Sequence, residues 1–423
     1  MPDKITLQEV SQALFCSIAD KLGTSVSKRE LNKGKYETYE KFLELKKNSK
    51  LVEDSFKRVE APNVSLKQIE DFLTTNNDWY ISSINIALEL LKQLSSISSK
   101  FGEAQANFQN LYYFRGDLDI MGNISKLFTK ANKNTDWAKL TKQPAFGNIN
   151  KWNPADIYLG SKKAKIEIKK ELNEAKDNYF FTDLNNLINR LIDSGNLLPL
   201  SLKKSTSAVH IVKVNFDSSY KKKLLSAVRF VEFNPWKKYK TSAWDYKSNK
   251  PKEKTESRDL KIKIIAEHNQ LTLKLRHDPA SGTGSGAHPG AFKVEVEGTG
   301  EARGGSIGSF KIFCDILFFI DKSFSKEILD IKKRAFKKFT REMEKRKYFK
   351  GQSGREKLEK KSKKAFNHFR GEVSALFVLN NVMSKLSDWL KRLNQKEKNK
   401  FARLCFEYIT SRSKMSGKFV IAK

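Results

Sequence analysis

Residues 151–159 read Lys-Trp-Asn-Pro-Ala-Asp-Ile-Tyr-Leu, and residues 200–204 read Leu-Ser-Leu-Lys-Lys. Each stretch holds a short apolar run of the length of a buried strand. The first run carries an acid, Asp156, and the second carries a lysine, Lys203. Residues 182–190, between them, have the spacing of a helix with one apolar face. This succession predicts an α/β arrangement in which the two stretches form neighbouring strands of one sheet.

The rest of the chain divides into three expected parts. Residues 1–140 repeat apolar residues at three- and four-residue steps, which predicts a helical N-terminal lobe. Residues 141–320 hold the α/β core, with further strands expected at residues 164–169, 209–216, 271–277 and 291–297. Residues 321–423 predict a basic helical C-terminal lobe. The expected fold class is α/β (α+β), with a central mixed sheet flanked by the two helical lobes.

The chain is strongly basic. Its 423 residues include 81 Lys and Arg against 48 Asp and Glu, a net charge of +33. A lysine surplus attracts polyanions through a diffuse field, so the expected partner is nucleic acid, DNA in the first place. A solubilising surface or the codon bias of an AT-rich genome would give the same composition, and both stay open. The 29 Phe supply core material, which argues against a disordered chain.

The acid and the lysine have a specific chemical meaning on a chain that contacts nucleic acid. A phosphodiester repels nucleophiles through its own charge, so its hydrolysis needs a cation and a group that delivers hydroxide. Magnesium prefers oxygen ligands and keeps several waters. Asp156 can supply one ligand and a backbone carbonyl on the adjacent strand another, while Lys203 can orient the attacking water. A turn acid and a solvated strand lysine are the simpler interpretation of the same two residues.

The element Pro154-Ala155-Asp156 followed by Ser201-Leu202-Lys203 resembles the PD-(D/E)XK nuclease superfamily. The resemblance implies a restriction-endonuclease-like core, with Asp156 and the Leu202 carbonyl as ligands of Mg²⁺ or Mn²⁺ and Lys203 as the catalytic lysine. The longer pattern, which continues through a Glu-containing strand to Ala302-Arg303-Gly304-Gly305, is also similar to uncharacterised proteins of tailed bacteriophages. The implied function is that of a phage-encoded, metal-dependent deoxyribonuclease.

Two features depart from the superfamily pattern. Ser201 stands where the second motif has an acid, and a long segment with a helix separates the two motifs. A hydroxyl is a poor magnesium ligand, so another carboxylate has to complete the site or the site is inactive. Glu295 and Glu297 are the candidates, because they alternate with valines and share one face of an expected strand. Cross-strand pairing with Lys274 or Arg276 is the structural alternative.

Four residues are the candidate nucleic-acid contacts: Lys204, Lys274, Arg276 and Arg303. Arg303 follows a glycine-rich stretch, where backbone N–H groups could approach a phosphate. The stretch lacks the Gly-Lys-Ser/Thr ending of a nucleotide-triphosphate loop. Two further functions compete with the nuclease: a non-catalytic nucleic-acid-binding or virion-associated protein on a degenerate nuclease fold, and a structural phage protein.

Other site and location signals are weak. The cysteines at positions 16, 314 and 405 have no CxxC spacing, so neither a zinc site nor a disulfide framework is indicated. Charged residues interrupt the first twenty positions, which argues against a signal peptide. The most apolar run, residues 310–320, reads as a buried strand or helix and is too short to span a bilayer. We expect a cytoplasmic protein, in the host cytoplasm if it is viral, with no membrane partner.

Overall fold

The structure of the protein, a computed structural model, falls into two compact units, each assembled from segments that are not consecutive in the sequence. The first unit holds residues 1–137, 148–219 and 414–423, and the second holds residues 138–147 and 220–413. These borders differ from the three consecutive parts expected from the sequence. The structure describes residues 2–31, 34–94, 97, 111–116, 119–141, 143–237, 244–245, 247–248, 250–251, 259–266, 269–277, 292–297, 306–307, 310–345, 373 and 376–423.

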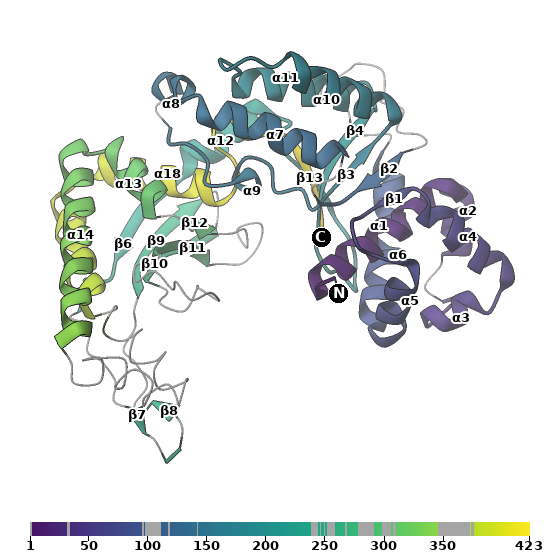
Figure 1. Ribbon diagram of the computed structural model, residues 1–423, viewed down its shortest axis with the longest axis horizontal. Coiled ribbons are helices and arrows are strands. Elements are labelled where there is room, and N and C mark those ends of the chain that lie inside the picture. Colours follow the sequence, from purple (N-terminus) through teal and green to yellow (C-terminus); the bar gives the residue numbers. More distant parts are fainter. Residues whose placement is uncertain are drawn as a thin grey trace. The chain divides into compact units, whose positions relative to one another are not determined.

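A six-stranded mixed sheet forms the centre of the first unit (Figure 1). Its strands lie in the order β1 (Val59–Glu60), β2 (Tyr112–Phe114), β3 (Ile157–Gly160), β4 (Leu197–Leu202), β13 (Phe419–Ala422) and β5 (Ile211–Val214). The pairs β1–β2 and β4–β13 are parallel, and the other neighbours are antiparallel. The predicted mixed α/β class is therefore confirmed, and the two quoted stretches do form adjacent strands.

Helices cover both faces of this sheet (Figure 1). Every residue of β3 and β4 is buried, as is typical of strands packed on two sides. On one face, Ile157, Leu198 and Leu200 belong to the same apolar core as α1 (Lys4–Leu22) and α6 (Asn77–Leu94). On the other face, α7 (Asp119–Lys133), α10 (Lys162–Glu174) and α11 (Phe181–Asp193) pack against β3 and β4. The sheet edge at the start of β3 and the end of β4 is where the polar residues of the two motifs lie.

Shorter helices complete the first unit. They are α2 (Thr24–Glu30), α3 (Tyr39–Leu43), α4 (Lys46–Phe56), α5 (Leu66–Thr75) and α9 (Ile149–Trp152). Helix α5 begins with a capping box, in which Ser65 and Gln68 each accept a hydrogen bond from the other's backbone N–H. The chain passes between the units four times: within α8 (Asp136–Thr141), between residues 147 and 148, within α12 (Ser218–Ala227), and between residues 413 and 414.

The strand expected at residues 164–169 is wrong, because these residues belong to α10. Ile166 and Ile168 suggested a strand by alternation, yet Ile166 is 68% exposed and Ile168 is buried together with Ala164, a spacing of four. The side chain of Ser161 caps the helix by accepting a hydrogen bond from the Ala164 N–H at 3.1 Å. The cap and the four-residue spacing favour the helix.

The second unit contains a five-stranded antiparallel sheet. Its strands lie in the order β12 (Ser306–Ile307), β11 (Phe292–Glu297), β10 (Asn269–His277), β9 (Asp259–Ala266) and β6 (Arg229–Phe233). Strand β9 alternates between buried and exposed residues, as a sheet with one wet face does. A separate pair is formed by β7 (Trp244–Asp245) and β8 (Lys250–Pro251).

The helices of the second unit are α13 (Phe310–Phe318), α14 (Lys322–Lys345), the π-helical turn η1 (Leu379–Met383), α17 (Ser384–Arg392) and α18 (Gln395–Ile409). Helix α13 resolves the apolar run at residues 310–320 as a buried helix. Within the described ranges, no helix has the length and apolar character needed to span a membrane.

Candidate active site

Asp156 lies at the edge of the first unit's sheet, directly before β3. Its backbone N–H donates to the Leu200 carbonyl at 2.9 Å, which continues the β3–β4 pairing by one residue. Asp156 consequently lies opposite Ser201, near the end of β4. Two motifs that are 45 residues apart in the sequence thus meet at one point of the sheet.

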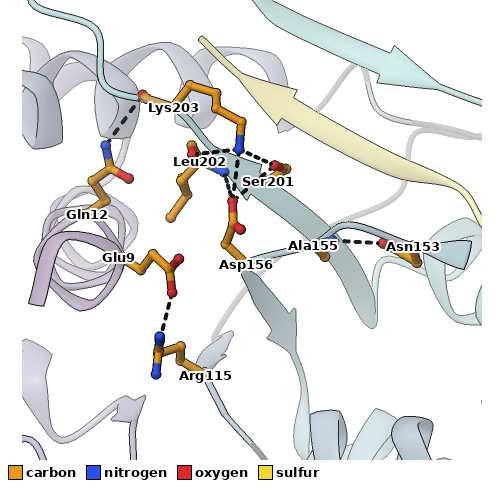
Figure 2. Close-up of polar contacts among 9 residues, drawn as sticks. All are labelled: Glu9, Gln12, Arg115, Asn153, Ala155, Asp156, Ser201, Leu202 and Lys203. Carbon is orange, nitrogen blue, oxygen red and sulfur yellow. Dashed lines mark hydrogen bonds and ion pairs between the residues drawn. The ribbon is translucent and has the colours of Figure 1, made fainter. Parts of the chain in front are cut away.

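Three groups donate hydrogen bonds to the same oxygen of Asp156, Oδ2 (Figure 2). They are the Leu202 backbone N–H at 2.6 Å, the Ser201 hydroxyl at 3.0 Å and the Lys203 ammonium at 3.4 Å. The Lys203 ammonium also donates to Ser201 Oγ at 2.9 Å and to the Leu202 carbonyl at 3.1 Å. Asp156, Ser201 and Lys203, all candidates from the sequence, are therefore brought together. Lys203 remains half exposed, so the cluster is open to solvent.

The loop before Asp156 is anchored to strand β13. The buried side chain of Asn153 donates to the Lys418 carbonyl at 3.1 Å and accepts from the Ala155 N–H at 3.1 Å. Next to it, the Trp152 carbonyl accepts from the Gly417 N–H at 2.9 Å, and the Trp152 ring is fully buried. Asn153 and Trp152 therefore fix the backbone from which Asp156 projects. Neither residue is among the site candidates predicted from the sequence.

A second carboxylate, missed in the sequence, approaches Asp156 from helix α1. Glu9 points toward the Asp156 cluster and accepts a hydrogen bond from Arg115 Nε at 2.7 Å (Figure 2). Gln12, one turn further along α1, lies within 3.5 Å of the Lys203 carbonyl. Glu9 stands in an ordinary amphipathic helix pattern, so no sequence signal marks it. Its role depends on α1 packing beside the end of β4.

Burial and charge act on Glu9 in opposite directions. Loss of hydration raises the pKa of the Glu9 carboxyl, and the Asp156 carboxylate raises it further, while Arg115 and Lys203 lower it. Burial is the largest of these effects, so the pKa of Glu9 lies above its ordinary value. The two carboxylates of Glu9 and Asp156 are matched by the two cations of Arg115 and Lys203. The four side chains therefore form a compact polar cluster that is nearly neutral.

The other candidate acids belong to a different sheet. Glu295 and Glu297 are on β11 in the second unit's sheet, while Asp156 borders the sheet of the first unit. Glu297 forms an ion pair with Lys274 across the β10–β11 hairpin, the structural alternative expected from the sequence. The structure does not bring either glutamate into one sheet with Asp156. Glu9, in the first unit, is a carboxylate that does approach Asp156.

The candidate nucleic-acid contacts are mostly paired with acids. Lys274 and Arg276 both contact Asp259, with Arg276 Nε at 2.9 Å from its carboxylate. Lys204 pairs with Asp78 and lies over the Trp79 ring, with its Nζ 5.5 Å from the ring centroid. Arg303 lies outside the described residues. These contacts give Lys274 and Arg276 an ordinary stabilising role in the second sheet.

The oxygen atoms in and around the Asp156 cluster are of the type that binds a hard cation such as Mg²⁺. The Lys203 ammonium already places a positive charge between the Asp156 carboxylate and the Leu202 carbonyl, the two oxygens that the resemblance predicts as metal ligands. Glu9 adds a third oxygen donor on the same side. Across the described part of the chain, no group of three or more His, Cys, Asp or Glu is arranged to hold a metal. A metal here would consequently depend on the backbone carbonyl and on water in addition to the two acids.

Comparison with protein-family models, with curated proteins and with solved structures finds no match to this chain. The geometry of the cluster is therefore the basis for any functional assignment.

Proposed function

We propose that the chain is a metal-dependent nuclease that cleaves DNA, with its site at the Asp156 cluster on a sheet of restriction-endonuclease-like type. The observation that carries the proposal is the meeting of Asp156, Ser201 and Lys203 around one carboxylate oxygen. The net charge of +33 supports a polyanionic substrate. A phage-encoded origin remains part of the proposal through the resemblance alone.

In this proposal the two acids and one carbonyl hold Mg²⁺ or Mn²⁺. Asp156, the Leu202 carbonyl and Glu9 would be the ligands, and the metal would supply charge neutralisation and a more acidic bound water. Lys203 positions and stabilises the attacking hydroxide near the phosphate. The Ser201 hydroxyl keeps Asp156 oriented. Glu9 provides the second carboxylate, which the superfamily pattern has at the position of Ser201. Arg115, released from Glu9, can neutralise a phosphate oxygen.

The test is cleavage of plasmid and linear DNA with Mg²⁺ or Mn²⁺, compared with EDTA. The variants Asp156→Ala and Lys203→Ala should each lower the rate by at least a hundredfold while DNA binding is kept. Lys57→Ala, which removes an exposed lysine of the first unit, should cleave like the unaltered protein. Cleavage retained in both site variants would overturn the proposal.

One observation favours a second function. Ser201 donates its hydroxyl to Asp156 instead of offering a second carboxylate to a metal. A degenerate site of this kind would leave a non-catalytic nucleic-acid-binding protein. Binding that weakens with salt, without any cleavage under all metal conditions, would support that alternative.

A further inference from the structure

Helix α14 separates apolar and cationic residues on two faces. The residues Phe324, Ile328, Ile331 and Ala335 are buried and recur at steps of three and four, so they form one face. This face packs within the second unit, where α13 and η1 are the neighbours of α14 (Figure 1). The orientation of the helix is therefore fixed by its apolar side.

The opposite side of α14 carries a concentration of positive charge. Five exposed cations project there, and we refer to them as the cationic face: Lys326, Lys333, Arg334, Lys337 and Arg341. At 100° per residue they lie within about a third of the helix circumference, on the side away from the buried residues. Between Lys326 and Arg341, Asp330 is the carboxylate that falls within this arc. The face therefore has a net charge of +4 over about 22 Å of helix.

The cationic face differs from several basic residues of the second unit's sheet in its ion pairing. No residue of the cationic face forms an ion pair with a described residue. In contrast, Lys263 pairs with Glu232, Lys274 with Glu297, and Arg276 with Asp259. Ion pairs neutralise these basic residues of the second unit's sheet, whereas the five cations of the cationic face are exposed to solvent. Keeping like charges this close costs stability unless a counter-charge covers them.

We propose that the cationic face binds the phosphate backbone of duplex DNA. Charge complementarity selects this occupant, because the face is a straight row of cations and the duplex is a straight row of anions. Each strand of DNA carries one phosphate per about 3.4 Å of axis, so 22 Å of helix spans about six base pairs. The choice of DNA as the polyanion rests on the proposed nuclease function, whereas the charge distribution on α14 is independent of that function.

The test measures the salt dependence of binding to a fluorescent 30-base-pair duplex, by anisotropy, in EDTA so that no cleavage occurs. A variant with Lys333→Gln, Arg334→Gln, Lys337→Gln and Arg341→Gln removes four cations and retains good helix formers. Because each phosphate contact contributes about 0.9 to the slope of log K against log salt, that slope should become shallower by about 3 to 4. Affinity at 100 mM salt should fall at least a hundredfold.

A matched control removes the same charge from paired positions of the first unit. Lys35→Gln, Lys41→Gln, Lys47→Gln and Lys57→Gln together also lower the net charge by four, and each of these lysines already has an acidic partner. The control should change the slope by less than 1. An equal change in both variants would mean a diffuse field and would overturn the proposal. Lys333→Arg with Lys337→Arg should keep the original slope, which separates charge from folding.

Two further measurements separate this proposal from its rivals. Asp156→Ala should keep the binding slope, so a failure of the nuclease assignment leaves this result readable. Sedimentation with vesicles of anionic phospholipid tests a membrane surface as the occupant. Loss of vesicle binding in the quadruple variant, with an unchanged slope on DNA, would overturn the proposal in favour of a membrane.

Discussion

Replacing Asn153 by Ala should loosen the loop that carries Asp156. The Asn153 side chain is 1% exposed and forms two hydrogen bonds, one to the Lys418 carbonyl and one from the Ala155 N–H, both at 3.1 Å. Its removal forfeits both bonds and leaves the buried Ala155 N–H and the partly buried Lys418 carbonyl without these partners. Each loss costs about 1 to 2 kcal/mol, so the first unit should be destabilised by about 2 to 4 kcal/mol.

Hydrogen–deuterium exchange provides the measurement, because a chain with two units need not unfold in one step. At 1.4 kcal/mol per tenfold, the amides of β3 and β13 should exchange about 30 to 700 times faster. Asn148→Ala is the control, since Asn148 is exposed and makes no side-chain capping bond, and it should stay within 0.5 kcal/mol. Equal exchange rates in the two variants would refute the reasoning.

Three more results are expected at the same edge of the sheet. Arg115→Met should tighten Mn²⁺ binding about tenfold in calorimetry, because the Glu9 carboxylate loses its competing partner, while Arg29→Met should leave it unchanged; weaker binding in Arg115→Met would contradict this. Burial raises the pKa of the Glu9 carboxyl above its ordinary value of 4.5. Protonated Glu9 therefore stabilises the folded state fully below pH 4.5, and this stabilisation is lost as the pH rises through the raised pKa. Mn²⁺ affinity should rise with pH over that same interval and lose the dependence in Glu9→Gln; an unchanged profile would exclude Glu9 as a ligand. Gly417→Ala should cost about 1 to 3 kcal/mol in urea unfolding, because a Cβ there would lie 3.0 Å from the buried Trp152 ring; a neutral effect would show that the ring can move.

The sequence was sufficient for the parts of the site that lie on strands. Short apolar runs predicted neighbouring strands within residues 151–159 and 200–204, and the structure has β3 at Ile157–Gly160 and β4 at Leu197–Leu202, so that Asp156 lies just before one strand and Lys203 just after the other. The order of the sheet was beyond prediction, because β13 is inserted between β4 and β5 from the far end of the sequence. Pairing between distant segments leaves no periodic signal in either one.

The acid that accompanies Asp156 shows the same limit. Glu295 and Glu297 had the alternation of a sheet face, which is a local pattern, and that pattern correctly described β11. Which sheet β11 joins is decided by long-range packing, so the pattern could not show that β11 and β3 belong to different sheets. Glu9 was missed because its approach to Asp156 depends on how α1 packs against the sheet.

The position of strand β13 in the sequence determines the order in which the parts of the site can assemble during synthesis. Asn153 meets Lys418 across 265 residues of sequence, and all of the second unit is encoded between the two partners apart from residues before 148. During synthesis, β4 leaves the ribosome long before its neighbour β13 does, so one edge of β4 has no strand partner until β13 emerges. The loop that orients Asp156 is completed only when residues 417–422 have emerged, which delays any activity of this cluster until residues 220–413 of the second unit have been translated. Ribosome-bound chains stalled before residue 414 should therefore show unprotected β4 amides, and full protection there would show that the sheet closes without β13.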